Sequence, residues 1–260
     1  MNLNWVESGN SNGELIIFIH GFMGDNSDWN IVNKSFEKDY HILAVDLPGH
    51  GKSDLPLNPY TFTSVAENIR HKINKYKKKS YIIGYSLGGR VALYCLDLFP
   101  QLLKGIILES SHPGLKNNKD KQKRYGQDLK LFQQVNSSEE LKLFLSQWYC
   151  NPIFKNINKH KNYFSMINKK TNNNIANLKK SLEYLSLGIQ ENFWPLLKIT
   201  NMPILFLSGE LDCKYSQIGK NLANINQKII EINIKNTSHN THFTHPEKYI
   251  SEIESFLENI

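Results

Sequence analysis

The sequence predicts an α/β domain with a mostly parallel, doubly wound sheet and an inserted helical cap. Short apolar runs alternate with amphipathic segments along most of the 260 residues, and one stretch in the middle of the chain breaks this alternation. Hydrophobic residues make up 40% of the chain, enough to bury a substantial core. We therefore expect a core built by residues 1–112 and 199–260, interrupted by a cap of residues 113–198.

The apolar runs predict strands, and the segments with helical spacing predict helices. Residues 15–19 are consecutive apolar side chains, as in a strand buried on both faces. In the segment 64–76, Val65, Ile69 and Ile73 recur at helical spacing. Strands are expected at residues 15–19, 41–45, 80–84, 104–108, 203–207 and 228–234, and helices at 64–76, 87–99, 215–225 and 246–257. Residues 113–198 contain no convincing strand and are rich in Lys, Asn, Gln and aromatic residues, which favours a helical cap.

The composition excludes several classes of function. The net charge is +7, but the basic residues are spread out with no aromatic-interleaved stripe, so no nucleic-acid partner is expected. The three cysteines are far apart and lack metal-ligand or disulfide spacing, which indicates neither a metal nor a disulfide framework. The first residues lack a signal-peptide pattern, and the longest apolar run is too short to span a bilayer. We expect a soluble protein of the cytoplasm, or of the plastid stroma in an organelle, of unpredicted oligomeric state.

The motif Gly84-Tyr85-Ser86-Leu87-Gly88 lies between a predicted strand and a predicted helix. A G-x-S-x-G motif in this context forms a sharp turn that exposes the serine hydroxyl at the start of the helix. The alternative is a glycine-rich turn with an inert serine. The motif together with the strand and helix predicts an α/β-hydrolase fold with Ser86 as the reactive residue.

A serine hydroxyl needs a histidine to become reactive near neutral pH. In this fold the chain order is serine, acid, histidine, which leaves His239, His242 and His245 as candidates. His239 lies in a polar loop directly after the strand predicted at 228–234, where the fold presents its histidine. His242 and His245 lie closer to the last helix, so His239 is the predicted base.

The acid is expected in the loop after the preceding strand. Asp212 follows the strand at 203–207 and is the predicted acid, with Glu210 as its near rival. Glu109 is a more distant candidate, because some relatives of the fold place the acid at the end of that strand. Asp46 precedes the serine and violates the chain order.

The fold also needs two backbone N–H donors for a developing oxyanion. Leu87 follows the serine, and the loop after the strand at 15–19 predicts Phe22 as the second donor. The His20 side chain is expected to support that loop, and His50 to pack within a second tight loop.

Basic residues near the serine point to an anionic substrate. Arg90 lies one helical turn after Ser86, which suggests a substrate carboxylate gripped by the planar guanidinium. Arg124 in the cap and Lys214 beside Asp212 add positive charge over the same cleft. The alternative is that these residues are solvated or paired elsewhere.

Several motifs together resemble the 2-succinyl-6-hydroxy-2,4-cyclohexadiene-1-carboxylate synthases of menaquinone and phylloquinone biosynthesis. The resemblance runs along most of the chain and is carried by the segments 20–25, 46–51, 84–90, 109–115, 171–174, 186–190, 209–215 and 239–242, and by Trp148-Tyr149 with Pro152 and Phe154. The combination is much more specific than any one of these segments.

The resemblance implies a lyase that expels pyruvate from a polycarboxylate substrate, without a cofactor or a metal. It implies Ser86 as a general base rather than a covalent nucleophile, and Tyr85 and Trp148 as pocket residues. The family commonly has an arginine where this sequence has Lys170; lysine keeps the charge but lacks the planar fork, so its substrate contact is left open. Ser238 and Met23 are further departures. The alternatives are a carboxylesterase or C–C bond hydrolase of the same fold, or a non-catalytic binding protein.

Overall fold

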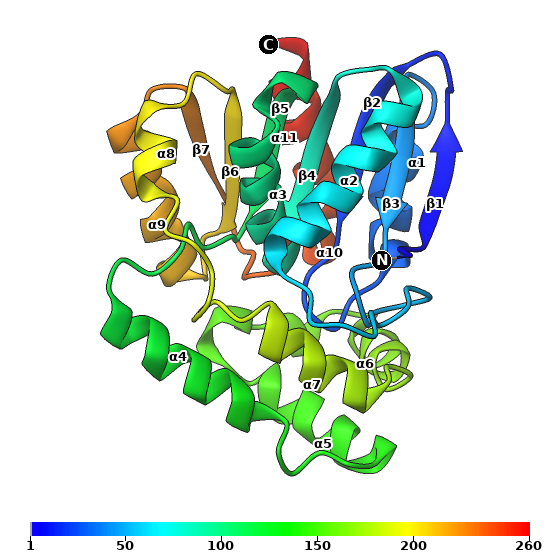
Figure 1. Ribbon diagram of the computed structural model, residues 1–260, viewed down its shortest axis with the longest axis vertical. Helices are drawn as coiled ribbons and strands as arrows, with labels where there is room; N and C mark the ends of the chain where they lie inside the picture. Colours follow the sequence, from blue (N-terminus) through cyan, green and yellow to red (C-terminus); the bar gives the residue numbers. More distant parts are fainter. Residues whose placement is uncertain (1) are drawn as a thin grey trace.

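A seven-stranded sheet forms the centre of the computed structural model, which describes residues 2–260 (Figure 1). The strands are β1 (Trp5–Gly9), β2 (Glu14–Ile19), β3 (Tyr40–Val45), β4 (Ser80–Tyr85), β5 (Leu103–Glu109), β6 (Ile204–Gly209) and β7 (Ile229–Ile234). They lie in the order β1-β3-β2-β4-β5-β6-β7. Only β1 is antiparallel to its neighbour, so the prediction of a mostly parallel α/β sheet is confirmed. The edge strand β1 was not predicted.

The helices connect these strands and cover the sheet. They are α1 (Asn30–Phe36), α2 (Phe62–Tyr76), α3 (Leu87–Leu98), α4 (Asn118–Leu131), α5 (Ser138–Trp148), α6 (Tyr163–Lys170), α7 (Ile175–Tyr184), α8 (Trp194–Ile199), α9 (Cys213–Ile225), α10 (Thr241–Thr244) and α11 (Pro246–Glu258). Helix α2 begins earlier than predicted because Thr61 and Ser64 form a capping box, with the Ser64 N–H donating to the Thr61 hydroxyl at 3.2 Å. Among residues 2–260, no helix is long and apolar enough to cross a membrane.

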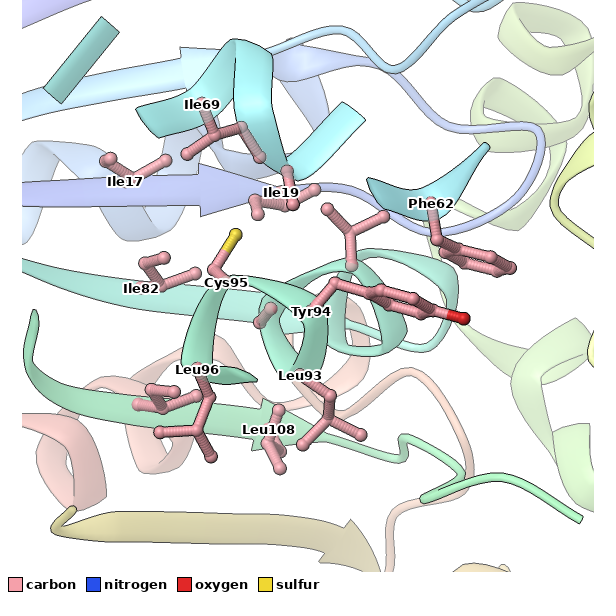
Figure 2. Packing of buried hydrophobic residues seen from close by; sticks show 14 of the residues in the cluster. Ile17, Ile19, Phe62, Ile69, Ile82, Leu93, Tyr94, Cys95, Leu96 and Leu108 are labelled. Carbon is pink, nitrogen blue, oxygen red and sulfur yellow. The ribbon is translucent and has the colours of Figure 1, made fainter. Parts of the chain in front are cut away.

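Each face of the sheet packs against its own set of helices. Alternate residues of β2 point to opposite faces: Ile17 and Ile19 pack with α2, α3, α8 and α9, whereas Ile16 and Phe18 pack with α1 and α11. Figure 2 shows the first of these clusters, in which Ile69 of α2 and Cys95 of α3 lie over Ile17, Ile19 and Ile82. The sheet is thus packed on both faces, and the ends of its strands lie between these two layers.

Helices α4 to α7 lie together at the edge of the sheet where the parallel strands end (Figure 1). They share a separate apolar cluster with Met23, which comes from the loop after β2. Helix α8 contacts α9, and its Leu197 belongs to the sheet's own core. The helical character of residues 118–184 agrees with the predicted insertion, while the domain boundaries at residues 113 and 198 stay a prediction.

Candidate active site

Ser86 lies in the turn between β4 and α3. Its backbone has φ 49° and ψ −103°, a conformation that residues other than glycine rarely adopt. Its N–H donates to the carbonyl of Glu109 at 2.8 Å, which ties the turn to β5. A Cβ at Gly84 would come within 2.6 Å of the Gly88 carbonyl oxygen, and a Cβ at Gly88 would collide with the carbonyl of Ile19. The two glycines therefore permit the turn that presents the serine.

The structure brings Ser86, His239 and Asp212 together. The Nε2 atom of His239 lies 3.3 Å from Ser86 Oγ, and its Nδ1 atom lies 2.6 Å from Asp212 Oδ2. Asp212 also caps α9, because its Oδ1 accepts the N–H of Tyr215 at 3.2 Å. A carboxylate can only accept hydrogen bonds, so Nδ1 carries the proton and Nε2 faces the serine as an acceptor. This arrangement can move a proton from the serine hydroxyl to the imidazole.

The rival candidates occupy other positions. Glu109 and His242 pair with each other, with 2.7 Å between Glu109 Oε2 and His242 Nδ1. Burial raises the pKa of a carboxyl group, but the His242 charge and the hydrogen bonds lower the pKa of Glu109 below its ordinary value. Glu210 accepts the N–H of Asn236 at 3.0 Å, and His245 stands at the start of α11.

Two backbone N–H groups flank the serine. Leu87 is the first residue of α3, so its N–H has no acceptor within the helix. Phe22 lies in the loop after β2 and lines the cavity next to Ser86. The ring of His20 supports this loop. Its Nδ1 donates to the carbonyl of the next residue, Gly21, at 2.7 Å, and its Nε2 accepts the N–H of Leu47 at 2.9 Å. The assignment of the Leu87 and Phe22 N–H groups as oxyanion donors stays a prediction.

A cavity of about 350 Å³ opens onto Ser86 and His239. Its walls come from the serine turn, the loop after β2, the cap and the start of α9. Of the predicted substrate-binding residues, the cavity is lined by Tyr85, Arg124, Trp148, Lys170 and Lys214. Three of these are cations, against one carboxylate in the cavity wall, Asp128, so the balance of charge favours an anionic molecule.

The cation Arg124 is oriented by an acidic neighbour. Its Nε atom lies 2.8 Å from Asp128 Oδ1, and the Ser186 hydroxyl donates to the other oxygen of Asp128 at 2.6 Å. Burial lowers the pKa of Lys214, and the positive charge of Arg124 lowers it further. A substrate carboxylate would relieve this repulsion between the two cations.

Lys170 is buried and supports the loop that carries Phe22. Its Nζ atom donates to the carbonyl of Met23 at 3.1 Å and lies 3.6 Å from Asp28 Oδ2. Asn173 donates to the same carbonyl at 3.2 Å. Lys170 therefore has a structural role beside its place in the cavity wall, and its substrate contact stays a prediction.

Arg90, unlike the other predicted substrate-binding residues, is not part of the cavity wall. Its guanidinium donates to the Leu185 carbonyl at 3.1 Å and lies over the Phe62 ring, with 5.4 Å to the ring centroid. Burial lowers the pKa of Arg90 to about 10, and Arg124 contributes to this shift. The Arg90 side chain is thus bonded to other groups of the protein, and a contact with substrate would require it to release the Leu185 carbonyl.

Some residues of the site were not predicted. Asn240 lines the cavity, and the hydroxyl of Tyr85 donates to its side-chain oxygen. Asp128 stands four residues after Arg124 on α4, a helical spacing that could have revealed it. The backbone N–H of His239 donates to the carbonyl of Ile153 at 2.9 Å, and a contact between backbone groups leaves no signal in the sequence. Within residues 2–260, no group of three or more His, Cys, Asp or Glu residues is placed to hold a metal ion.

Comparison with known proteins agrees with this geometry. A family model described as the alpha/beta hydrolase fold matches residues 14–246. The 2-succinyl-6-hydroxy-2,4-cyclohexadiene-1-carboxylate synthase of Escherichia coli O157:H7 (strain EC4115 / EHEC) is 32% identical over 243 residues, which cover 93% of each chain. That of Serratia proteamaculans (strain 568) is 29% identical over 257 residues, covering 98% of this chain and 97% of the relative. The solved structure of MenH from S. aureus has a TM-score of 0.91 and 27% identity, covering 99% of this chain and 98% of that one. The chain therefore belongs to the 2-succinyl-6-hydroxy-2,4-cyclohexadiene-1-carboxylate synthase family, whose members are lyases with the α/β-hydrolase fold.

Proposed function

We propose that this enzyme eliminates pyruvate from 2-succinyl-5-enolpyruvyl-6-hydroxy-3-cyclohexene-1-carboxylate, giving 2-succinyl-6-hydroxy-2,4-cyclohexadiene-1-carboxylate in menaquinone or phylloquinone biosynthesis. The observation that carries the proposal is the contact of His239 with both Ser86 and Asp212 beside a cavity lined by Arg124, Lys170 and Lys214. A relay of this kind supplies a base, and the cations match a substrate that carries several carboxylates.

In the proposed mechanism Ser86 acts as the base. His239 takes the hydroxyl proton through Nε2, and the serine oxygen removes a proton from the substrate ring. The electrons of the broken C–H bond form a double bond to the next ring carbon, the existing ring double bond shifts to the carbon that bears the enolpyruvyl group, and the C–O bond to that group breaks. The proton held by His239 returns to the leaving enolpyruvate, which becomes pyruvate, so no water is consumed. Asp212 orients His239 and stabilises its positive charge.

Negative charge develops on the succinyl carbonyl as the ring proton leaves. The N–H groups of Phe22 and Leu87 bind this oxygen, and the start of α3 adds the positive end of the helix dipole. Arg124 and Lys214 bind substrate carboxylates. Tyr85 and Trp148 form aromatic walls around the substrate ring. The chemistry is proton transfer and C–O cleavage, which requires no electron carrier.

Pyruvate release from this substrate, measured beside hydrolysis of a p-nitrophenyl ester, tests the proposal. We expect fast pyruvate release with little ester cleavage, and loss of pyruvate release in Ser86→Ala. Fast ester cleavage without pyruvate would instead support a carboxylesterase or C–C bond hydrolase, which can use the same relay. Retained pyruvate release in Ser86→Ala would refute the role of the serine.

A further inference from the structure

Two segments that carry the family resemblance meet at one buried carboxylate. Glu109, at the end of β5, accepts hydrogen bonds from the segment that follows His239. Its Oε1 accepts the Thr241 N–H at 2.7 Å, the Thr241 hydroxyl at 2.6 Å and the His242 N–H at 3.1 Å. Its Oε2 lies 2.7 Å from His242 Nδ1. One side chain thus holds the residues two and three positions beyond the predicted base.

The same residue also holds the serine. The Ser86 N–H donates to the Glu109 carbonyl at 2.8 Å, and the Ser111 hydroxyl lies within hydrogen-bond distance of both that carbonyl, at 3.1 Å, and the Ser86 carbonyl, at 3.2 Å. Through its backbone Glu109 fixes the turn with Ser86, and through its side chain it fixes the segment with His239. The two attachments thus flank the contact between Ser86 Oγ and His239 Nε2, which lie 3.3 Å apart.

The pair of Glu109 and His242 is enclosed by aromatic side chains. The carboxylate is 0% exposed, and the His242 ring lies against Trp29 and Tyr85, with 4.6 Å and 4.8 Å between ring centroids. Tyr85 in turn lies 5.5 Å from the His239 ring and donates its hydroxyl to Asn240. Removal of the Glu109 carboxylate would leave the buried donors of Thr241 and His242 without their acceptor, which is unfavourable.

We propose that Glu109 is a positioning residue that sets the distance and orientation between Ser86 and His239. It acts through Thr241 and His242 and does not touch the substrate. The inference rests on the proposed function only in taking Ser86 and His239 as the reactive pair.

Two substitutions separate the contributions of Glu109. Glu109→Ala removes all four side-chain contacts, whereas Glu109→Gln keeps an oxygen for the Thr241 donors but removes the charge. Glu7→Gln is the chemically matched control, because Glu7 Oε1 lies 2.7 Å from His41 Nε2 in another carboxylate–imidazole pair at the β1–β3 edge of the sheet. Each variant is first checked by thermal unfolding and then assayed well below its midpoint.

Two readouts are compared: steady-state pyruvate release, and the rate at which a fluorophosphonate labels Ser86, with Ser86→Ala as the blank. A shift of about 1 Å in catalytic geometry can cost about 100-fold in rate. We expect kcat and the labelling rate to fall together by about 100-fold in Glu109→Ala and about tenfold in Glu109→Gln, with KM within about twofold of wild type. Glu7→Gln should retain both rates.

A folded Glu109→Ala with wild-type labelling and kcat would overturn the proposal, as would a change in KM alone. If Glu109→Ala does not fold, Glu109→Gln decides, and Thr241→Val, which removes only the hydroxyl donor, decides if neither folds. Labelling does not need the natural substrate, so a wild type that is labelled but releases no pyruvate refutes the proposed function and leaves this inference testable. A wild type that is not labelled at Ser86 refutes the reactive pair and the inference with it.

Discussion

The substitution Asp212→Asn tests how the relay controls the proton on His239. Asp212 Oδ1 accepts the Tyr215 N–H at 3.2 Å, and its Oδ2 lies 2.6 Å from His239 Nδ1. In the variant the amide oxygen remains with the Tyr215 N–H, so the amide NH₂ group faces the imidazole. The ring must then accept at Nδ1 and carry its proton on Nε2, which lies 3.3 Å from Ser86 Oγ. A protonated Nε2 cannot take the serine proton.

The expected loss is large and falls on turnover. In triads of this type the same change lowers kcat by about 10⁴-fold, which corresponds to about 5.4 kcal/mol at about 1.36 kcal/mol per factor of ten. Because Asp212 is buried behind His239, we expect KM to stay within about threefold of wild type. Pyruvate release, followed by coupling to lactate dehydrogenase and NADH oxidation, measures both constants.

Glu210→Gln is the matched control for Asp212→Asn. Glu210 is exposed, lies two residues before Asp212 and accepts the Asn236 N–H at 3.0 Å, so its loss leaves His239 in place. We expect kcat within about twofold of wild type for this control. If Asp212→Asn kept a tenth or more of wild-type turnover, the argument from the histidine proton would be refuted. A large loss in Glu210→Gln would move the acid role to Glu210.

Three further predictions follow from the cavity, the serine turn and a buried histidine. Arg124→Ala should raise KM about tenfold with little change in kcat, as expected for a lost charge-assisted hydrogen bond, and an unchanged KM in pyruvate-release kinetics would contradict its role. Gly88→Ala should lower the free energy of unfolding, measured in urea, by about 2–3 kcal/mol, because the new methyl group meets the Ile19 carbonyl. Gly126→Ala, in open space on α4, should raise it by about 0.5–1 kcal/mol. Equal effects of the two substitutions would count against the clash. Burial lowers the pKa of His50 to about 3, so below pH 6.5 the unfolded chain binds a proton that the folded protein does not, and stability falls with falling pH. The wild type should therefore lose more free energy of unfolding between pH 7 and pH 5 than His50→Gln does, by about 2 kcal/mol. The same pH dependence of urea unfolding in both proteins would refute this.

The relay could be predicted because its members follow the ends of parallel strands. Ser86 follows β4, Asp212 follows β6 and His239 follows β7, and the carboxyl ends of these strands meet at one edge of the sheet. The structure brings Ser86 and His239, which are 153 positions apart in sequence, to 3.3 Å between Oγ and Nε2. The strand β1 escaped prediction because it pairs only with β3 at the sheet edge and most of its residues are exposed, which leaves no apolar pattern.

The positions of individual side chains in the site were harder to predict. The spacing of Arg90 from Ser86 placed it near the site, but its partner is the Leu185 carbonyl, 95 residues away where the cap returns to the sheet. Such a contact depends on the path of the cap, which no local pattern encodes. Glu109 was weighed as the acid and His242 as the base, whereas their pairing with each other appears only when β5 and the segment after β7 are placed in space.

His239 is held from three separate parts of the chain, one of which also supplies walls of the cavity. Asp212 contacts the Nδ1 atom of the His239 ring. Glu109 accepts the backbone N–H groups of Thr241 and His242, which follow in the chain. The carbonyl of Ile153 in the cap accepts the backbone N–H of His239. The first two attachments belong to the sheet and fix the imidazole relative to Ser86. The third comes from the same cap that supplies Arg124 and Trp148 to the cavity. A displacement of the cap would therefore move the proposed substrate-binding groups and the proposed base together, so both proposed roles depend on one arrangement of the cap.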